Sequence, residues 1–189
     1  NHMIVTVDNN FVNVASQGNR GIDVNLRYER DIGPGELTLQ GEATFILEDV
    51  TQIFLAGESD DFLGTTFNFR GPEIVARGLI RYDVNDWTMN WTMNYIGEGS
   101  DDAQFGGDVF PSTVYGQNVR FEQSVDPLVY HDFSVRKRFE NENGADISLV
   151  LGLQNIFDER PPGQSTGQFR RGTAALNAYD LIGRRGFFT

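Results

Sequence analysis

Residues 86–97 (DWTMNWTMNYIG) constrain the fold of this chain more than any other stretch, because large apolar residues occupy every second position. Thr and Asn fill most of the positions between them. A period of two places the two sets on opposite faces of a β-strand, whereas a helix would mix them around its surface. The large face therefore meets either the packed core of a soluble sheet or the lipid around a membrane barrel, with Trp87 and Tyr95 near the two interfaces.

The rest of the chain contains further segments with strand character, shown by alternation or by β-branched residues. The clearest two are residues 21–30 and 36–49, which a DIGPG turn joins into a predicted hairpin. Together these segments give about eight strands, and we predict an all-β, antiparallel fold. The predicted strands are residues 4–7, 21–30, 36–49, 73–82, 86–97, 128–139, 146–157 and 177–189.

The connections between the predicted strands alternate between short turns and long loops. If each strand crosses a slab, all short turns lie on one side and all long loops on the other. This sorting is typical of outer-membrane barrels, which have short periplasmic turns and long extracellular loops. Strands of about 10–13 residues also suit a tilted span better than a globular sheet. The predicted short turns are residues 31–35, 84–86 and 141–144, and the predicted long loops are residues 50–72, 98–127 and 158–176.

Composition limits the classes of function. The chain has 189 residues, enough for one domain or one large β unit, and no cysteine, so disulfides and thiolate chemistry are excluded. Its net charge of -12 argues against a nucleic-acid partner. It has no run of about 18 apolar residues, as a membrane-spanning helix requires, but alternating barrel strands need no such run.

Three local patterns resemble the C-terminal part of the barrel of TonB-dependent outer-membrane receptors. The first is FVN at residues 11–13 followed by QGNRGID at residues 17–23. The second is LQNIFDERPP at residues 153–162, and the third is YDLIGRRGFF at residues 179–188. The three occur in the order and on the alternating strands that the family shows, and the resemblance covers almost the whole chain.

The resemblance implies a bacterial outer-membrane protein that works as a non-enzymatic importer of a scarce nutrient, such as a siderophore, a cobalamin or a glycan. Family barrels resemble a 22-stranded wall around an N-terminal plug, and here only about eight strands are predicted. Gly186 also occupies a position where the family has an aromatic residue. We therefore interpret residues 1–189 as a C-terminal barrel segment, with the plug and its TonB-contacting box absent. The expected partners are outer-membrane lipid, the remaining barrel strands and plug, the TonB complex through that plug, and a small nutrient ligand.

Charged residues on the polar strand faces are candidates for a lumen lining. In a barrel these faces point inward, toward water or a plug. The structural interpretation is a cross-strand charge ladder. The functional alternative is docking of the plug or guidance of an anionic substrate. The predicted lumen-facing residues are Arg27, Arg77 and Arg81, with Asp23, Glu29, Glu42 and Glu73 as possible neighbours.

Aromatic residues gather in segments that look too polar and glycine-rich to form strands. Exposed loop aromatics usually mark packing between loops or a binding surface. In a receptor they would line the extracellular mouth, together with an arginine beside the last of them. The predicted substrate-binding residues are Phe62, Phe67, Phe69, Phe105, Phe110, Tyr115, Phe121, Phe169 and Arg170.

No catalytic constellation is apparent, so we predict that the chain is not an enzyme and holds no metal or cofactor. His2 and His131 show no metal-ligand spacing. The acidic pairs at residues 60–61 and 101–102 lack the ligand spacing of a calcium loop. Two other functions stay open: an interaction module that completes a partner barrel, and a soluble carbohydrate-binding sheet. The second accounts for the aromatics but not for the sorted loops.

Overall fold

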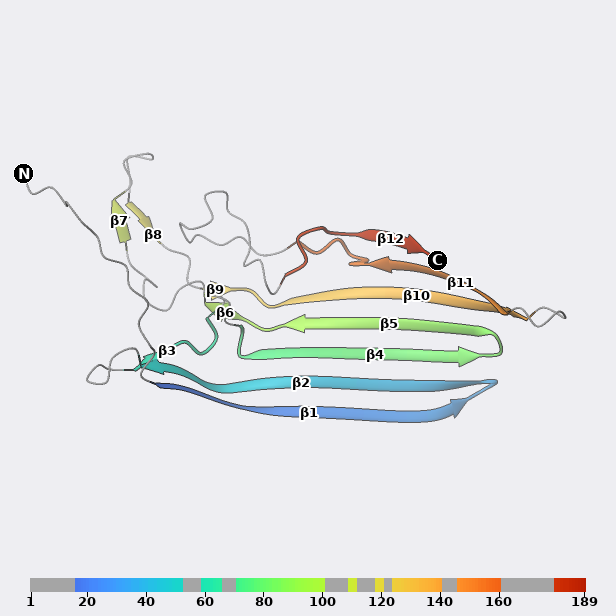
Figure 1. The fold of residues 1–189 in the computed structure, drawn as a ribbon. Coiled ribbons are helices and arrows are strands. Elements are labelled where there is room, and N and C mark those ends of the chain that lie inside the picture. The colour runs from blue at the N-terminus through green and yellow to red at the C-terminus, as the bar shows by residue number, and fades with distance from the viewer. Residues whose placement is uncertain are drawn as a thin grey trace, which may run out of the picture.

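A computed structural model describes residues 16–52, 59–65, 71–100, 109–111, 118–120, 124–140, 146–160 and 179–189, and within these ranges it contains strands and no helix. One antiparallel sheet of eight strands dominates (Figure 1), in the order β1-β2-β4-β5-β10-β11-β12, with β3 beside β2. This confirms the predicted all-β, antiparallel fold. The main-sheet strands are β1 (Ser16–Ile32), β2 (Gly35–Gln52), β3 (Asp60–Asp61), β4 (Ile74–Val84), β5 (Trp87–Ile96), β10 (Leu128–Glu140), β11 (Asp146–Gln154) and β12 (Arg185–Phe188).

Four short strands form two small hairpin-like sheets apart from the main one. They are β6 (Gly99–Ser100), β7 (Val109–Pro111), β8 (Asn118–Arg120) and β9 (Ser124–Val125). β6 pairs with β9, and β7 pairs with β8. The prediction of an unstructured loop over residues 98–127 is therefore wrong in part. Backbone pairing between two segments of the same connection supplies local order that side-chain alternation over two or three residues does not reveal.

Several predicted boundaries are also corrected. β2 continues to Gln52 and pairs with β3 inside the predicted loop of residues 50–72. β11 ends at Gln154 rather than at residue 157, because Asn155 has a φ of 49° that breaks the extended chain. Gly183 has a φ of 80°, and the final strand begins only at Arg185 rather than at residue 177. The predicted strand at residues 4–7 lies outside the described residues.

The ends of the long strands are sorted as predicted. The turn after β1 uses Gly33 at φ 59°, and the turn after β4 uses Asn85 at φ 51°, two residue types that enter the left-handed region most readily. Figure 1 shows these two turns at one end of the sheet, together with the paired ends of β10 and β11 at Glu140 and Asp146. The long connections, after β2, β5 and β11, leave from the opposite end. We call these the turn end and the connection end.

The strand registers carry the period of two across the whole sheet. Trp91 lies beside Ile80 on β4 and Phe133 on β10, and Leu39 on β2 pairs with Ile80 in turn. The same row continues through Tyr28 on β1 and Leu153 on β11. These residues define the apolar face. The alternate rows place Arg81 beside Thr38 and Asn90, and they define the polar face.

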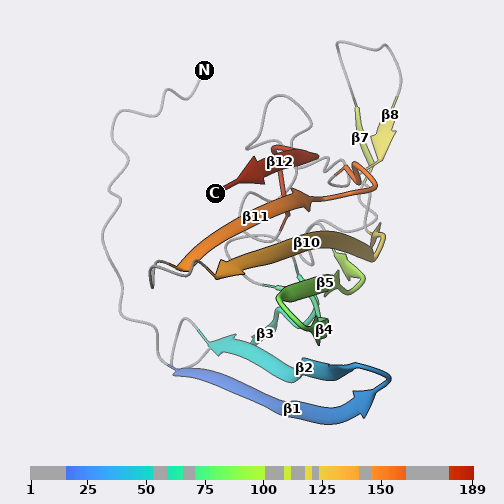
Figure 2. The same cartoon turned by 90° about the vertical axis from the view of Figure 1, so that its right-hand side faces the viewer.

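The apolar face has no layer packed on it in the described part of the chain. Viewed along the strands, the sheet is one curved layer (Figure 2). Leu26 is 67% exposed, Leu151 55% and Trp87 43%, although residues of these types are usually buried. Among the described residues, the buried hydrophobic cluster consists instead of Ile96, Tyr130 and Tyr179, at the connection end. The sheet is therefore two-sided, and many of the large side chains on its apolar face are exposed.

Candidate functional site

The polar face carries a charge network near the turn end. Arg81 donates to Asp83 over 2.5 and 2.9 Å, both on β4. The Thr88 hydroxyl donates to the same carboxylate over 2.6 Å, and Arg136 of β10 donates to the Thr88 hydroxyl over 3.1 Å. This chain of hydrogen bonds crosses three strands and neutralises a carboxylate with two cations nearby. The polar groups at the turn end of the polar face therefore have hydrogen-bond partners, which restricts their side chains.

The predicted lumen-facing arginines all lie on the polar face, but the predicted cross-strand ladder is partly wrong. Arg27 pairs with Glu29, and Arg81 pairs with Asp83, each two residues along its own strand. Residues i and i+2 share one face of a strand, so a long arginine reaches its own strand neighbour as readily as the next strand. Arg77 lies opposite Glu42 in the register of β2 and β4, as a ladder requires. Asp23 instead accepts a hydrogen bond from Thr44 over 2.6 Å.

A small hollow opens on the polar face between β2 and β4. It encloses about 150 Å³ and is lined by Gln40, Glu42, Arg77 and Leu79. Glu42 and Arg77 are direct partners in the register of β2 and β4, so the lining carries an anion and a cation side by side. The hollow is a candidate contact surface on the described part of the polar face.

The second and third sequence motifs meet at the connection end of the sheet. The Asp158 carboxylate accepts the Arg184 amide over 3.0 Å, and the Arg184 side chain donates to the Ile156 carbonyl over 3.4 Å. Two segments that are separated in sequence by residues 161–178 are thereby joined by hydrogen bonds between backbone and side-chain groups. We call residues 153–160 and 179–185 the corner.

Asn155 holds the first half of the corner. It is 1% exposed, and its side chain donates to the Glu159 carbonyl over 2.9 Å and accepts the Glu159 amide over 2.8 Å. Its own amide donates to the Asp132 carboxylate of β10 over 2.8 Å. Asparagine suits this position because its short amide tolerates positive φ and bonds nearby backbone groups. The turn that follows β11 is thus fixed to β10.

Asp180 and Arg185 stabilise the second half of the corner, residues 179–185. The Arg185 guanidinium donates to both Asp180 oxygens, over 2.7 and 3.0 Å, and its Nε donates to Gln154 over 2.7 Å. Burial opposes the charge on Asp180, but hydrogen bonds from the Ile182 amide and from Arg185 outweigh it and hold the pKa of this carboxyl below its ordinary value. The Asp180 amide donates to the Tyr130 hydroxyl over 3.1 Å. Beside it, burial raises the pKa of the Tyr179 phenol.

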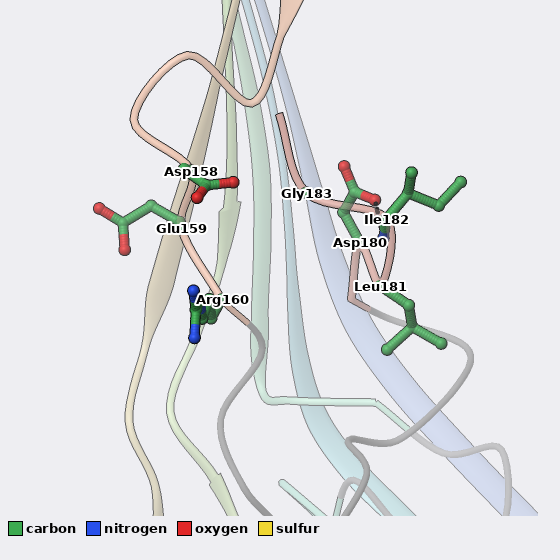
Figure 3. Close-up of a pocket in the computed structure, with 7 residues that line it drawn as sticks. All are labelled: Asp158, Glu159, Arg160, Asp180, Leu181, Ile182 and Gly183. Atoms are coloured by element: carbon green, nitrogen blue, oxygen red, sulfur yellow. Dashed lines mark hydrogen bonds between the residues drawn. The ribbon is translucent and has the colours of Figure 1, made fainter. Parts of the chain in front are cut away.

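A second hollow of about 360 Å³ lies between the two halves of the corner. Figure 3 shows Asp158, Glu159 and Arg160 on one segment and residues 180–183 on the other, with the space between them. Leu181 and Ile182 add exposed apolar surface to its wall. The hollow is open and of mixed charge, and it lies where the chain leaves the sheet toward the long connection.

Most of the predicted substrate-binding residues lie outside the described part of the chain. Phe62 is described and half-buried, directly after β3, and its amide donates to the Asp49 carbonyl over 2.8 Å. Phe110 lies in β7, which corrects the prediction that its segment is not a strand. The residues outside the described ranges are Phe67, Phe69, Phe105, Tyr115, Phe121, Phe169 and Arg170.

The corner residues were not predicted as a site, although the motifs that contain them were recognised. Asn155, Asp158, Asp180 and Arg185 all belong to the patterns at residues 153–162 and 179–188. The available signal for these residues was their position as polar residues at the ends of predicted strands. Their pairing across the connection could not be read from either pattern alone.

Comparison with known proteins gives no match: neither a protein-family model, nor a curated protein, nor a solved structure is similar enough to this chain. Within the described ranges, no helix has the length and apolar character needed to cross a membrane. Among the same residues, no group of three or more His, Asp or Glu side chains is arranged to hold a metal ion.

Proposed function

We propose that this chain is a C-terminal wall segment of a TonB-dependent outer-membrane receptor and contributes strands and mouth loops to a non-enzymatic nutrient importer. The observation that carries the proposal is the outward-facing apolar surface that runs across the strands of the main sheet. In water such a surface would be an aggregation hazard, because soluble monomers rarely expose large contiguous apolar patches. In a bilayer it is the favourable arrangement.

The sorted connections support the same proposal. With the turn end in the periplasm, the connection end faces outward and presents the corner and the long connections to the medium. The polar face then lines the interior, where the hollow beside Arg77 and Glu42 would meet the plug or the passing ligand. The nutrient would be of the siderophore, cobalamin or glycan class. The plug would carry the contact with the TonB complex.

The two edge strands of the sheet have backbone groups that would need pairing with strands of a partner. In the described part of the chain, β1 pairs on one side only, with β2, and β12 covers only the last residues of β11. Each unsatisfied backbone group in lipid costs several kcal/mol. The remaining strands of the same wall would cover both edges.

Lipid contact tests the proposal directly, because Trp87 and Trp91 are the only tryptophans and both lie on the apolar face. The protein is reconstituted into vesicles that contain phospholipids brominated on their acyl chains. We expect strong quenching of tryptophan emission by the brominated chains and little quenching by iodide in the water. Quenching by iodide alone would contradict the proposal.

Barrel formation is tested separately by electrophoresis in mild detergent with and without heating. A heat-dependent change in mobility supports a closed barrel assembled from this chain and its partner strands. An unchanged mobility combined with full solubility without detergent would favour a soluble sheet. Lipid quenching without any partner strands in the particle would favour a separate interaction module.

A further inference from the structure

One histidine on the apolar face, in β10, contacts side chains from two other segments, β5 and the turn after β11. His131 of β10 accepts a hydrogen bond at Nδ1 from the Trp91 indole N–H of β5, over 3.1 Å. Its ring meets Phe157, in the turn after β11, edge to face with centroids 5.1 Å apart. The Trp91 ring lies 5.8 Å away in a similar arrangement. His131 is thus the central member of an aromatic trio.

A backbone hydrogen bond links the same two segments, β10 and the turn after β11. The Ile156 amide donates to the His131 carbonyl over 2.8 Å, so the turn that carries Phe157 is bonded to the residue whose ring it contacts. That turn is the first half of the corner, from which the chain leaves toward residues 161–178. Anything that moves the imidazole therefore acts on the beginning of this connection.

The hydrogen bond fixes the protonation state that the trio requires. An indole N–H can only donate, so the nitrogen that receives it must carry a lone pair. Nδ1 is therefore unprotonated, and the ring proton of His131 lies on Nε2. A second proton would occupy Nδ1, turn the acceptor into a donor and set two N–H groups against each other.

No anion in the described part of the chain is positioned to compensate that charge. Asp132 points to the polar face and accepts the Asn155 amide, and Asp158 accepts the Arg184 amide. The nearest charged group on the same face of β10 is Lys137, three alternate positions further along. Among the described side chains on this face, the titratable neighbour is Tyr95 of β5, two residues from Met93, which lies opposite His131. The side chains around the imidazole on this face are Trp91, Met93 and Tyr95 of β5, Val129 and Phe133 of β10, and Phe157.

We propose that Trp91, His131 and Phe157 form a pH-sensitive latch that holds the corner to the sheet while His131 is neutral and releases it when His131 is protonated. Histidine is the side chain whose charge ordinarily changes between about pH 5 and 8. Protonation replaces the indole hydrogen bond by two opposed N–H groups, so the imidazole must turn away from Trp91 and out of the position in which it meets Phe157. The inference does not rest on the proposed function, since these contacts are present whatever surrounds the apolar face.

The indole N–H of Trp91 reports on the latch in the unmodified protein. The two tryptophans give two indole signals in a ¹H–¹⁵N spectrum, which the W87F variant assigns. We expect the Trp91 signal to shift reversibly from about pH 8 to about pH 5, while the Trp87 signal stays constant. A Trp91 signal that does not change with pH overturns the proposal.

Two variants and one exchange measurement separate a latch from a passive contact. His131→Gln and His131→Asn keep a hydrogen-bond acceptor but cannot titrate in this range, so the Trp91 signal should lose its pH dependence. Protection of the Ile156 amide against hydrogen exchange, corrected for intrinsic rates, should fall roughly two- to tenfold at the lower pH in the wild type only. A titration that persists in either variant, or an Ile156 protection that is unchanged in the wild type, overturns the proposal.

Discussion

The two faces of the sheet are built on the same strands but are stabilised in different ways. The polar face is a network in which Arg81, Asp83, Thr88 and Arg136 satisfy one another across three strands. On the apolar face, side-chain hydrogen bonds such as those of Trp91 with His131, Tyr82 with the Ile32 carbonyl and Lys137 with Asp86 are isolated pairs, and many of the large apolar side chains are exposed. Within the described part of the chain, the polar face thus finds hydrogen-bonding partners, whereas the apolar face has no covering layer.

The largest expected effect comes from placing the same charge on each face at adjacent positions. Ile80→Lys puts an ammonium on the apolar face, and Leu79→Lys puts it beside Glu42 on the polar face. In vesicles we expect Ile80→Lys to lower the free energy of unfolding by about 2–4 kcal/mol, because a lysine near the middle of a bilayer is poorly solvated.

Leu79→Lys is the matched control and should change the stability by less than about 1 kcal/mol. Urea unfolding from the lipid-bound state measures both variants. Equal effects of the two substitutions would mean that the apolar face does not contact hydrocarbon.

The next effect concerns the corner, where the hydrogen bonds of the polar side continue past β11. Asn155→Ala removes two bonds to Glu159 and places alanine at a φ of 49°. We expect a loss of about 2–3 kcal/mol in unfolding free energy, from the two lost hydrogen bonds and the left-handed backbone. Asn155→Gly removes the bonds but tolerates the backbone, so it should lose less. A glycine variant that is as unstable as the alanine variant would show that backbone strain plays no part.

Two glycines near the end of the sheet, one on each face, allow a comparison of the space available to an added methyl group. A methyl group at Gly152 would overlap the ring of Phe187, which lies across it on the polar face, whereas one at Gly186 would meet Leu153 at an ordinary distance of 3.5 Å. Gly152→Ala should therefore destabilise the protein by about 1–3 kcal/mol. Gly186→Ala should be near neutral. Thermal unfolding compares the two, and Phe187→Ala in the Gly152→Ala background should restore most of the loss.

The smallest expected effect depends on pH. The folded-state pKa of Asp180 is lowered, so its charge stabilises the fold above the unfolded value of about 4 and this contribution is lost as the pH falls through the folded value. Asp180→Asn should cost about 1 kcal/mol at neutral pH. The difference from wild type should disappear under strongly acidic conditions. A difference that is constant with pH would mean that Asp180 acts by shape alone, and Asp146→Asn, at an exposed strand end, serves as the neutral control.

The sequence was sufficient for the features that depend on neighbours along the chain. Alternation in residues 86–97 placed Trp87 and Trp91 on one face, and Gly33 and Asn85 marked turns, because strand geometry and positive φ are local properties. It was not sufficient for partner choice. Arg27 had acidic neighbours on two strands, and which one it met depended on rotamer and register rather than on pattern.

The amino-acid sequence by itself determined that this chain forms a two-sided antiparallel sheet, with its turns at one end and its long connections at the other. A period of two and a few turn residues are enough for that, because each acts over only a few residues of chain. Only the tertiary structure decided that residues 153–160 and 179–185 meet and that β12 is short. It also decided that His131 lies between Trp91 and Phe157. Such contacts join residues distant in sequence, and they depend on strand register and on the left-handed residues that redirect the chain.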